Sequence, residues 1–279
     1  MVICVAGMHR SGSSLVARLL NLSGVYLGRD EDLLPGNPTN PDGHWEHERI
    51  VELNDELLAE FGGGWDYPPD LSGLSDRARV DHIERAARAV LQQFDGHACW
   101  GWKDPRNSLT LPFWRRLIGP LRVVVCVRNP LEVAMSLRRR GASSLALGLS
   151  LWTAYNESIL RVTRPDERIV THYQNYLIDP AAEIARLAAR LGLPLTPDEL
   201  ARVSATVRHE SRHNYFTSED LQRANVSSRV MSAYRRLSEE AGVVDGTQDG
   251  DSLAEPHFND LAGRFAYPAL KDHLVRRVG

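Results

Sequence analysis

The chain has 279 residues, of which 33 are basic and 36 acidic, so its formal net charge is −3. This charge excludes a nucleic-acid binder that works through a diffuse basic field, and it excludes a polybasic membrane anchor. No apolar run reaches the roughly 18 residues that span a bilayer, and no basic segment of a secretory leader precedes the first apolar run. Lysine occurs only at Lys103 and Lys271, and the remaining basic residues are arginines.

The three cysteines, Cys4, Cys99 and Cys126, each stand beside apolar or aromatic residues. An odd number of cysteines in such surroundings is typical of buried thiols in a reducing compartment. We therefore expect a cytoplasmic protein that has no disulfide and no metal-binding cysteine.

Short apolar strands alternate with helical stretches through residue 191. Strands are predicted at residues 2–6, 98–102, 121–127 and 168–172. Helices are predicted at residues 13–22, at 50–61, from a cap at Ser75 to about 94, and at 181–191, which Gly192 ends. The alternation predicts an α/β fold, a P-loop-type central parallel β-sheet flanked by helices, with ligands at the carboxyl ends of its strands.

The composition also predicts how the chain is divided. Residues 1–241 are expected to form the α/β domain. Residues 242–256 are rich in glycine and acidic side chains, which is typical of a flexible loop or linker. Residues 257–279 are expected to form a C-terminal tail that Pro268 interrupts.

An anion-binding loop is predicted between the first strand and the first helix. Gly7 and Gly12 have the spacing of the nucleotide-triphosphate P-loop, whose backbone N–H groups converge on a phosphate. Ser13 stands where that loop has its lysine, and the strand at 121–127 ends in Arg128 and has no magnesium-binding aspartate after it. The pattern indicates a nucleotide with a single 5′-phosphate group, although a glycine turn that only caps a helix is the alternative.

A second anion site is predicted around Arg128, at the end of the strongest strand. Pro130 suits the first turn of a new helix, Ser136 follows on it, and the arginines at 138–140 close it. Arginine and serine side chains placed in this way can bind a dianion through charge-assisted hydrogen bonds. Arginines at a helix end also offset the helix dipole, which is a sufficient reason for Arg138 and Arg139.

These motifs together resemble those of sulfotransferases that use 3′-phosphoadenosine-5′-phosphosulfate (PAPS). Residues 7–15 resemble the 5′-phosphosulfate loop, Arg128 with Ser136 resembles the 3′-phosphate motif, and residues 102–106 (WKDPR) resemble a third block of bacterial and tyrosylprotein sulfotransferases. Tyr173 resembles a tyrosine that borders the nucleotide, although Gln174 replaces the usual glutamate. The resemblance implies PAPS as donor, 3′,5′-adenosine bisphosphate as product and no metal. The donor-binding residues that we expect are His9, Arg10, Ser11, Gly12, Ser13, Ser14, Arg128, Ser136, Arg140, Tyr173 and Arg212.

The general base is expected within residues 43–48 (GHWEHE), which carry four titratable side chains. The resemblance implies Glu46, while His44 and His47 are the alternatives because another branch of the superfamily uses histidine. Glu46 and Glu48 would also favour a helix N-terminus without any catalytic role. A metal site at His44 and His47 lacks a third ligand.

Lys103 is the expected point charge on the leaving phosphate, because a chain that otherwise uses arginine retains a compact ammonium there. Arg10 resembles the arginine that helps neutralise the sulfuryl group. The aromatic loop at 61–69 is expected to cover the active site, whereas Trp152 and Tyr155 are expected in the core.

The function that we expect is sulfuryl transfer from PAPS to a hydroxyl of a small molecule or glycan, without a nucleic-acid partner. A P-loop kinase with a degenerate loop and a non-catalytic nucleotide-binding module are the alternatives.

Overall fold

The computed structural model describes residues 1–37, 40, 42–139, 144–208 and 216–243. Four strands form one parallel sheet with the order β2-β1-β3-β4. They are β1 (Val2–Ala6), β2 (Trp100–Lys103), β3 (Arg122–Val127) and β4 (Arg168–His172). The parallel α/β fold expected from the sequence is thereby confirmed, and β1 and β3 are the two inner strands.

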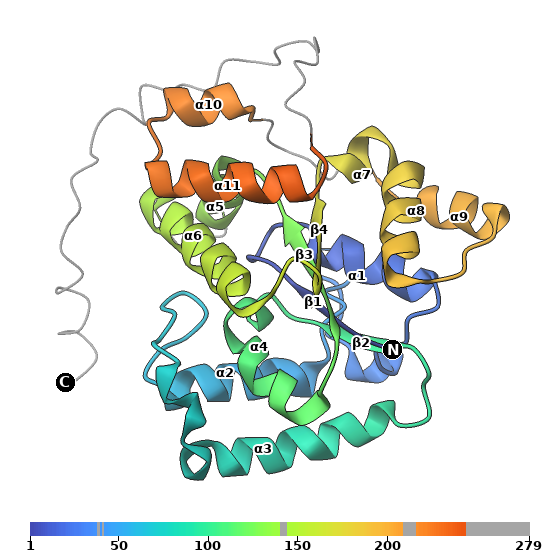
Figure 1. The fold of residues 1–279 in the computed structure, drawn as a ribbon, viewed down its shortest axis with the longest axis vertical. Helices are drawn as coiled ribbons and strands as arrows, with labels where there is room; N and C mark the ends of the chain where they lie inside the picture. Colours follow the sequence, from blue (N-terminus) through green and yellow to red (C-terminus); the bar gives the residue numbers. More distant parts are fainter. Residues whose placement is uncertain (38–39, 41, 140–143, 209–215, 244–279) are drawn as a thin grey trace.

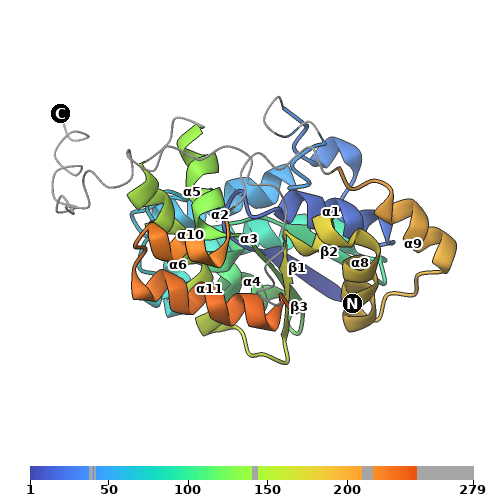
Figure 2. The same ribbon diagram turned by 90° about the horizontal axis from the view of Figure 1, so that it is seen from above.

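Helices cover both faces of the sheet (Figures 1 and 2). One face carries α1 (Ser13–Leu22), α8 (Pro180–Leu191) and α9 (Pro197–Ser204), with the short α7 (Asn175–Ile178) at the end of β4. The other face carries α2 (Glu48–Glu60), α3 (Arg77–Leu91), α4 (Asn107–Ile118), α5 (Pro130–Arg139), α6 (Leu145–Val162), α10 (Ser218–Arg223) and α11 (Ser228–Glu240). Short 3-10 turns lie at Asp30–Asp32, Ser72–Ser75 and Gln92–Phe94.

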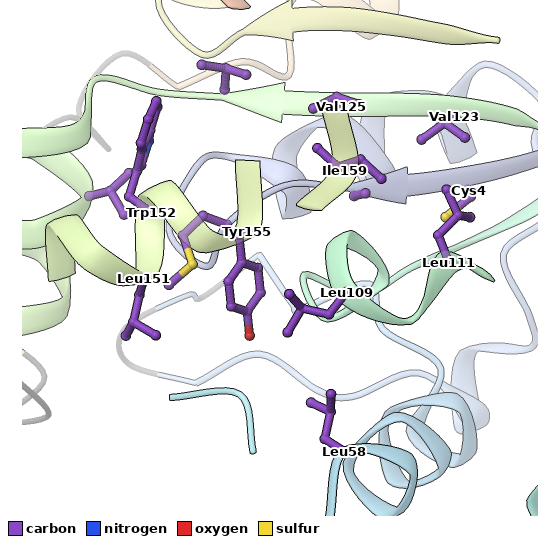
Figure 3. Close-up of a cluster of buried hydrophobic side chains, with 14 of the residues drawn as sticks. Cys4, Leu58, Leu109, Leu111, Val123, Val125, Leu151, Trp152, Tyr155 and Ile159 are labelled. Carbon is purple, nitrogen blue, oxygen red and sulfur yellow. The ribbon is translucent and has the colours of Figure 1, made fainter. Parts of the chain in front are cut away.

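The sheet is buried on both faces, which explains why its strands are continuous apolar runs rather than alternating ones. Along β3, Val123 and Val125 face the core beneath α4 and α6, whereas Val124 and Cys126 face the core beneath α1 and α8. Figure 3 shows the first of these cores, in which strand side chains meet Leu111 of α4 and Ile159 of α6. This packing fixes the carboxyl ends of the strands as one edge.

Two local predictions need correction. Asp76, and not Ser75, caps α3, because its carboxylate accepts the N–H of Ala78 at 3.1 Å. The second strand begins at Trp100 rather than at residue 98, since pairing with Val2 of β1 starts there. None of the helices in the described ranges combines the length and the apolar character that a membrane span needs.

Candidate functional site

The loop between β1 and α1 has a backbone that only glycine fits at two positions. Gly7 has φ 132°, and a Cβ atom there would stand 2.4 Å from the carbonyl oxygen of Cys126. Gly12 has φ 88°, and a Cβ atom would stand 2.4 Å from Cδ2 of Tyr173. Between them, the N–H of Ser11 donates to the carbonyl of Met8 at 3.1 Å and closes a turn. The loop therefore presents the N-terminus of α1 at the carboxyl edge of the sheet.

Arg10 connects this loop with the predicted second anion site. Its φ of 70° is in the left-handed region, which costs a residue with a Cβ atom about 1–2 kcal/mol. In this conformation its Nε donates to Oγ of Ser136 on α5 at 2.9 Å, and its carbonyl accepts Nη1 of Arg128 at 3.4 Å. The two sites predicted from separate motifs are thus joined through one residue.

The hydroxyl of Ser11 can both donate and accept a hydrogen bond, and it has no partner among the residues that the structure describes. Its side chain is 1% exposed, and no group in the described part of the chain lies within hydrogen-bonding reach of its Oγ. A buried hydroxyl without a partner costs about 1–3 kcal/mol, and a bound anion at the loop would satisfy it. The residues at this loop therefore fit a phosphate group.

Arg128 leaves the end of β3 and is 8% exposed. Its Nε donates to Oε2 of Glu132 at 2.6 Å, and its guanidinium lies 4.5 Å from the ring centroid of Tyr173. Tyr173 in turn contacts the Gly12 backbone, so one aromatic ring touches both predicted anion sites. Arg140 and Arg212, which were also expected here, lie outside the described residues.

Lys103 and Glu46 form a buried ion pair at the end of β2. Their side chains are 2% and 10% exposed. The Lys103 ammonium also donates to Oγ of Ser14 at 3.1 Å and to the carbonyl of His44 at 3.2 Å. The ammonium therefore lies between the first turn of α1 and the loop that carries the expected base.

The turn that presents Glu46 is strained. Trp45 has φ 56°, which is a rare conformation for a bulky residue, and its Nε1 donates to the carbonyl of Asp42 at 2.8 Å. Arg10 in the anion-binding loop is a second left-handed residue with a side chain. Strain of this kind persists where the surrounding structure requires it, and it is common at functional sites.

The two neighbouring histidines point to different partners. His44 Nε2 lies 2.8 Å from Nδ2 of Asn37, and His47 Nε2 lies 3.0 Å from Oε1 of Gln93. His47 is 3% exposed and packs beside Phe94. Within the described ranges, no three His, Cys, Asp or Glu side chains are grouped so that they could hold a metal ion.

A buried polar network lies behind Lys103. The sequence motif at residues 102–106 did not predict the contacts of Asp104 and Arg106. Arg106 binds both carboxylate oxygens of Asp55 on α2, at 2.5 and 3.1 Å, and donates to Asp104 at 3.0 Å. Asn54 donates to the other oxygen of Asp104 at 2.8 Å. Burial raises the pKa of the Asp104 carboxyl, and the neighbouring Arg106 opposes that shift. The network joins α2 to the strand end that carries Lys103.

Asn54 is the residue from which this network could have been predicted in the sequence. It follows Leu53 on the apolar face of α2, where a fully buried amide requires partners. Its Oδ1 accepts hydrogen bonds from Thr110 Oγ1 at 2.7 Å and from Trp114 Nε1 at 2.9 Å, both on α4.

The aromatic loop at 61–69 contacts the anion-binding loop through His9. The ring centroid of His9 lies 4.8 Å from that of Trp65 and 5.8 Å from that of Tyr155. The Tyr155 hydroxyl donates to the carbonyl of Trp65 at 2.7 Å. Tyr155 and Trp152 are fully buried, which confirms that they belong to the core.

Residues 3–198 match the profile described as the Sulfotransferase family, and they make up most of the chain. The chain belongs to the sulfotransferase family. No curated protein sequence matches it.

Solved structures of sulfotransferases are similar to this one at low sequence identity. STF1 of Mycobacterium tuberculosis H37Rv is 15% identical with a TM-score of 0.46, over 87% of this chain and 76% of its own. The sulfotransferase domain of the Synechococcus PCC 7002 olefin synthase is 17% identical with a TM-score of 0.48, over 85% and 86%. A sulfotransferase of Alicyclobacillus acidocaldarius is 17% identical with a TM-score of 0.47, over 86% and 95%.

Proposed function

We propose that this sulfotransferase moves a sulfuryl group from PAPS to a hydroxyl of a small molecule or glycan and releases 3′,5′-adenosine bisphosphate. The observation that carries the proposal is the position of the Lys103 ammonium, which contacts Ser14 of the anion-binding loop and the Glu46 carboxylate at once. An acid–base group and a cation are thereby placed at the end of the loop that fits a phosphate.

The donor would be held at two places. The backbone N–H groups of the loop, with the hydroxyls of Ser11, Ser13 and Ser14, would hold its 5′-phosphosulfate. Arg128 and Ser136 would hold its 3′-phosphate, with Arg10 between the two groups. His9 and Tyr173 border the same loop, and Gly12 leaves the space that Tyr173 occupies.

The residues of this chain have distinct chemical roles in the proposal. When bound, PAPS supplies an activated sulfuryl group on a phosphate that can leave with its negative charge. Glu46 accepts the proton of the acceptor hydroxyl, so that the oxygen attacks as the proton is removed. Lys103 and Arg10 keep positive charge where negative charge develops on the departing phosphate and on the sulfuryl oxygens. Glu46 is preferred to His44 and His47 because its carboxylate contacts the Lys103 ammonium, whereas Nε2 of each histidine contacts Asn37 or Gln93.

We further propose that the transfer needs no metal ion. Ser13 replaces the P-loop lysine, and Arg128 stands where a strand-end aspartate would bind magnesium. The transferred sulfuryl group carries less charge than a phosphoryl group, so the side-chain cations named above suffice to neutralise it.

Thermal unfolding of the protein with added nucleotides tests the proposal. Bisphosphate, ATP and GTP are compared, each with magnesium and with EDTA. We expect the bisphosphate to raise the unfolding temperature equally in both conditions. Stabilisation by ATP or GTP that requires magnesium would contradict the proposal and support a kinase. Binding of the bisphosphate without sulfate transfer to any hydroxylated acceptor would support a non-catalytic module.

A further inference from the structure

A buried glutamate that no motif assigned lies against Arg128. Glu132 belongs to the first turn of α5 and is 1% exposed. Its Oε2 accepts Nε of Arg128 at 2.6 Å, and its Oε1 accepts the backbone N–H of Phe216 at 3.4 Å. Asn129 donates to the carbonyl of the same Phe216 at 2.9 Å. A carboxylate bonded through both oxygens is fixed, so it can hold the arginine in one orientation.

The remaining contacts define which edge of the guanidinium is left for a ligand. Its face lies on the Tyr173 ring at 4.5 Å, and Nη1 reaches the Arg10 carbonyl at 3.4 Å. Nη2 has no hydrogen-bond partner within the described ranges. Glu132 therefore occupies the Nε side, while the Nη side faces the anion-binding loop.

We propose that Glu132 is a positioning residue for donor recognition, which orients Arg128 so that its Nη edge selects a nucleotide with a 3′-phosphate. The inference rests on the proposed function, because it assumes that Arg128 binds the 3′-phosphate of the donor. Glu132 itself touches no part of the nucleotide and acts through the arginine.

Two effects of the Glu132 charge oppose each other. The carboxylate neutralises part of the positive charge that attracts the phosphate, so its removal could strengthen binding. It also fixes a flexible side chain before the ligand arrives, and a side chain that must be ordered on binding lowers the affinity. We expect fixation to prevail, because Oε1 of Glu132 is held by the Phe216 N–H while Oε2 holds Nε of Arg128, and the Tyr173 ring restrains the face of the guanidinium. A free Arg128 would also lose a charge-assisted hydrogen bond that points its Nη edge at the loop.

Calorimetric titration with 3′,5′-adenosine bisphosphate and with adenosine 5′-phosphate tests this role. The dissociation constant of adenosine 5′-phosphate divided by that of the bisphosphate measures recognition of the 3′-phosphate alone. A loss of folding would weaken the binding of both ligands and leave this ratio unchanged. We expect Glu132→Ala to reduce the ratio about tenfold and Glu132→Gln to reduce it less, since glutamine keeps an acceptor for Nε. The affinity of both variants for adenosine 5′-phosphate should stay within about twofold of that of the unsubstituted protein.

Glu183→Gln is the matched control. Glu183 is 5% exposed and pairs with Arg186 on α8 at 2.6 Å, so the same substitution removes an equally buried charge outside the donor site. This control should leave the ratio unchanged. If the unsubstituted protein binds the bisphosphate more tightly than adenosine 5′-phosphate, an unchanged or increased ratio in the Glu132 variants would overturn the positioning role alone. An unsubstituted protein that binds both nucleotides equally well would overturn the proposed donor as well.

Discussion

Glu46→Gln separates the proposed base from the ion pair in which it takes part. Glutamine keeps the size of the side chain and an oxygen for the Lys103 ammonium, but it cannot accept a proton. Loss of a general base costs about 100-fold or more in turnover, which is about 2.7 kcal/mol of the barrier. We therefore expect turnover to fall at least about 100-fold while affinity for the bisphosphate changes little.

The structure also sets the expected effect of Glu46→Gln on stability. Removing one partner of a buried pair costs about 3–5 kcal/mol when the other charge is left alone. Lys103 is 2% exposed but keeps its hydrogen bonds to Ser14 and the His44 carbonyl, at 3.1 and 3.2 Å. The free energy of unfolding should therefore fall by only about 1–3 kcal/mol.

The assay is release of bisphosphate or of labelled sulfated product, with donor binding measured separately on each variant. Glu48→Gln is the control, because Glu48 lies two residues further on, in the first turn of α2, and is exposed. It should retain turnover. Near-normal turnover of Glu46→Gln with intact donor binding would refute the role of Glu46 as base and favour His44 as the base.

Four further outcomes are expected. Lys103→Ala should lower turnover at least about 100-fold in the same assay, because the proposed mechanism relies on this buried cation to stabilise the developing charge. Gly12→Ala should abolish bisphosphate binding in calorimetry, since its Cβ would clash with Tyr173 at 2.4 Å. Asn54→Ala should lower the free energy of unfolding in urea by about 2–4 kcal/mol, as two buried donors on α4 lose their acceptor. Burial raises the pKa of Cys126 from 9.0 to about 12, so its stabilising contribution is complete below pH 9 and is lost as the pH rises toward 12. Between pH 8 and pH 11, the free energy of unfolding measured in urea should therefore fall by about 2–3 kcal/mol more in the unsubstituted protein than in Cys126→Ala.

The strands and the first helix could be predicted from the sequence because their apolar patterns are unambiguous. The ranges predicted for β1, α1 and β4 agree with the structure residue for residue. Helix α4 was not predicted, since it contains Pro112 and its first turn buries the polar side chains of Asn107, Ser108 and Thr110, which a sequence pattern assigns to the surface. Its identity follows from tertiary packing rather than from local sequence.

The candidate site shows the same division. The residues of the loop and of the Arg128 motif were predicted because their spacing is local. The contact of Lys103 with Glu46 joins residues that only the pairing of β1 with β2 and the strained turn at Trp45 bring together. The spacing of Arg128 and Glu132 permits a helical ion pair, but Phe216, which fixes the other carboxylate oxygen, comes from a distant segment. Such contacts require the fold to be known.

A crystal structure of the protein with 3′,5′-adenosine bisphosphate would test the donor site most directly. We predict that the 5′-phosphate lies on the 7–14 loop within hydrogen-bonding distance of Ser11 Oγ, and that the 3′-phosphate is bound by Arg128 and Ser136. The distance between the 5′-phosphate and the Lys103 ammonium should be short enough for a hydrogen bond. A bisphosphate bound elsewhere, or one whose 3′-phosphate contacts neither Arg128 nor Ser136, would contradict the account.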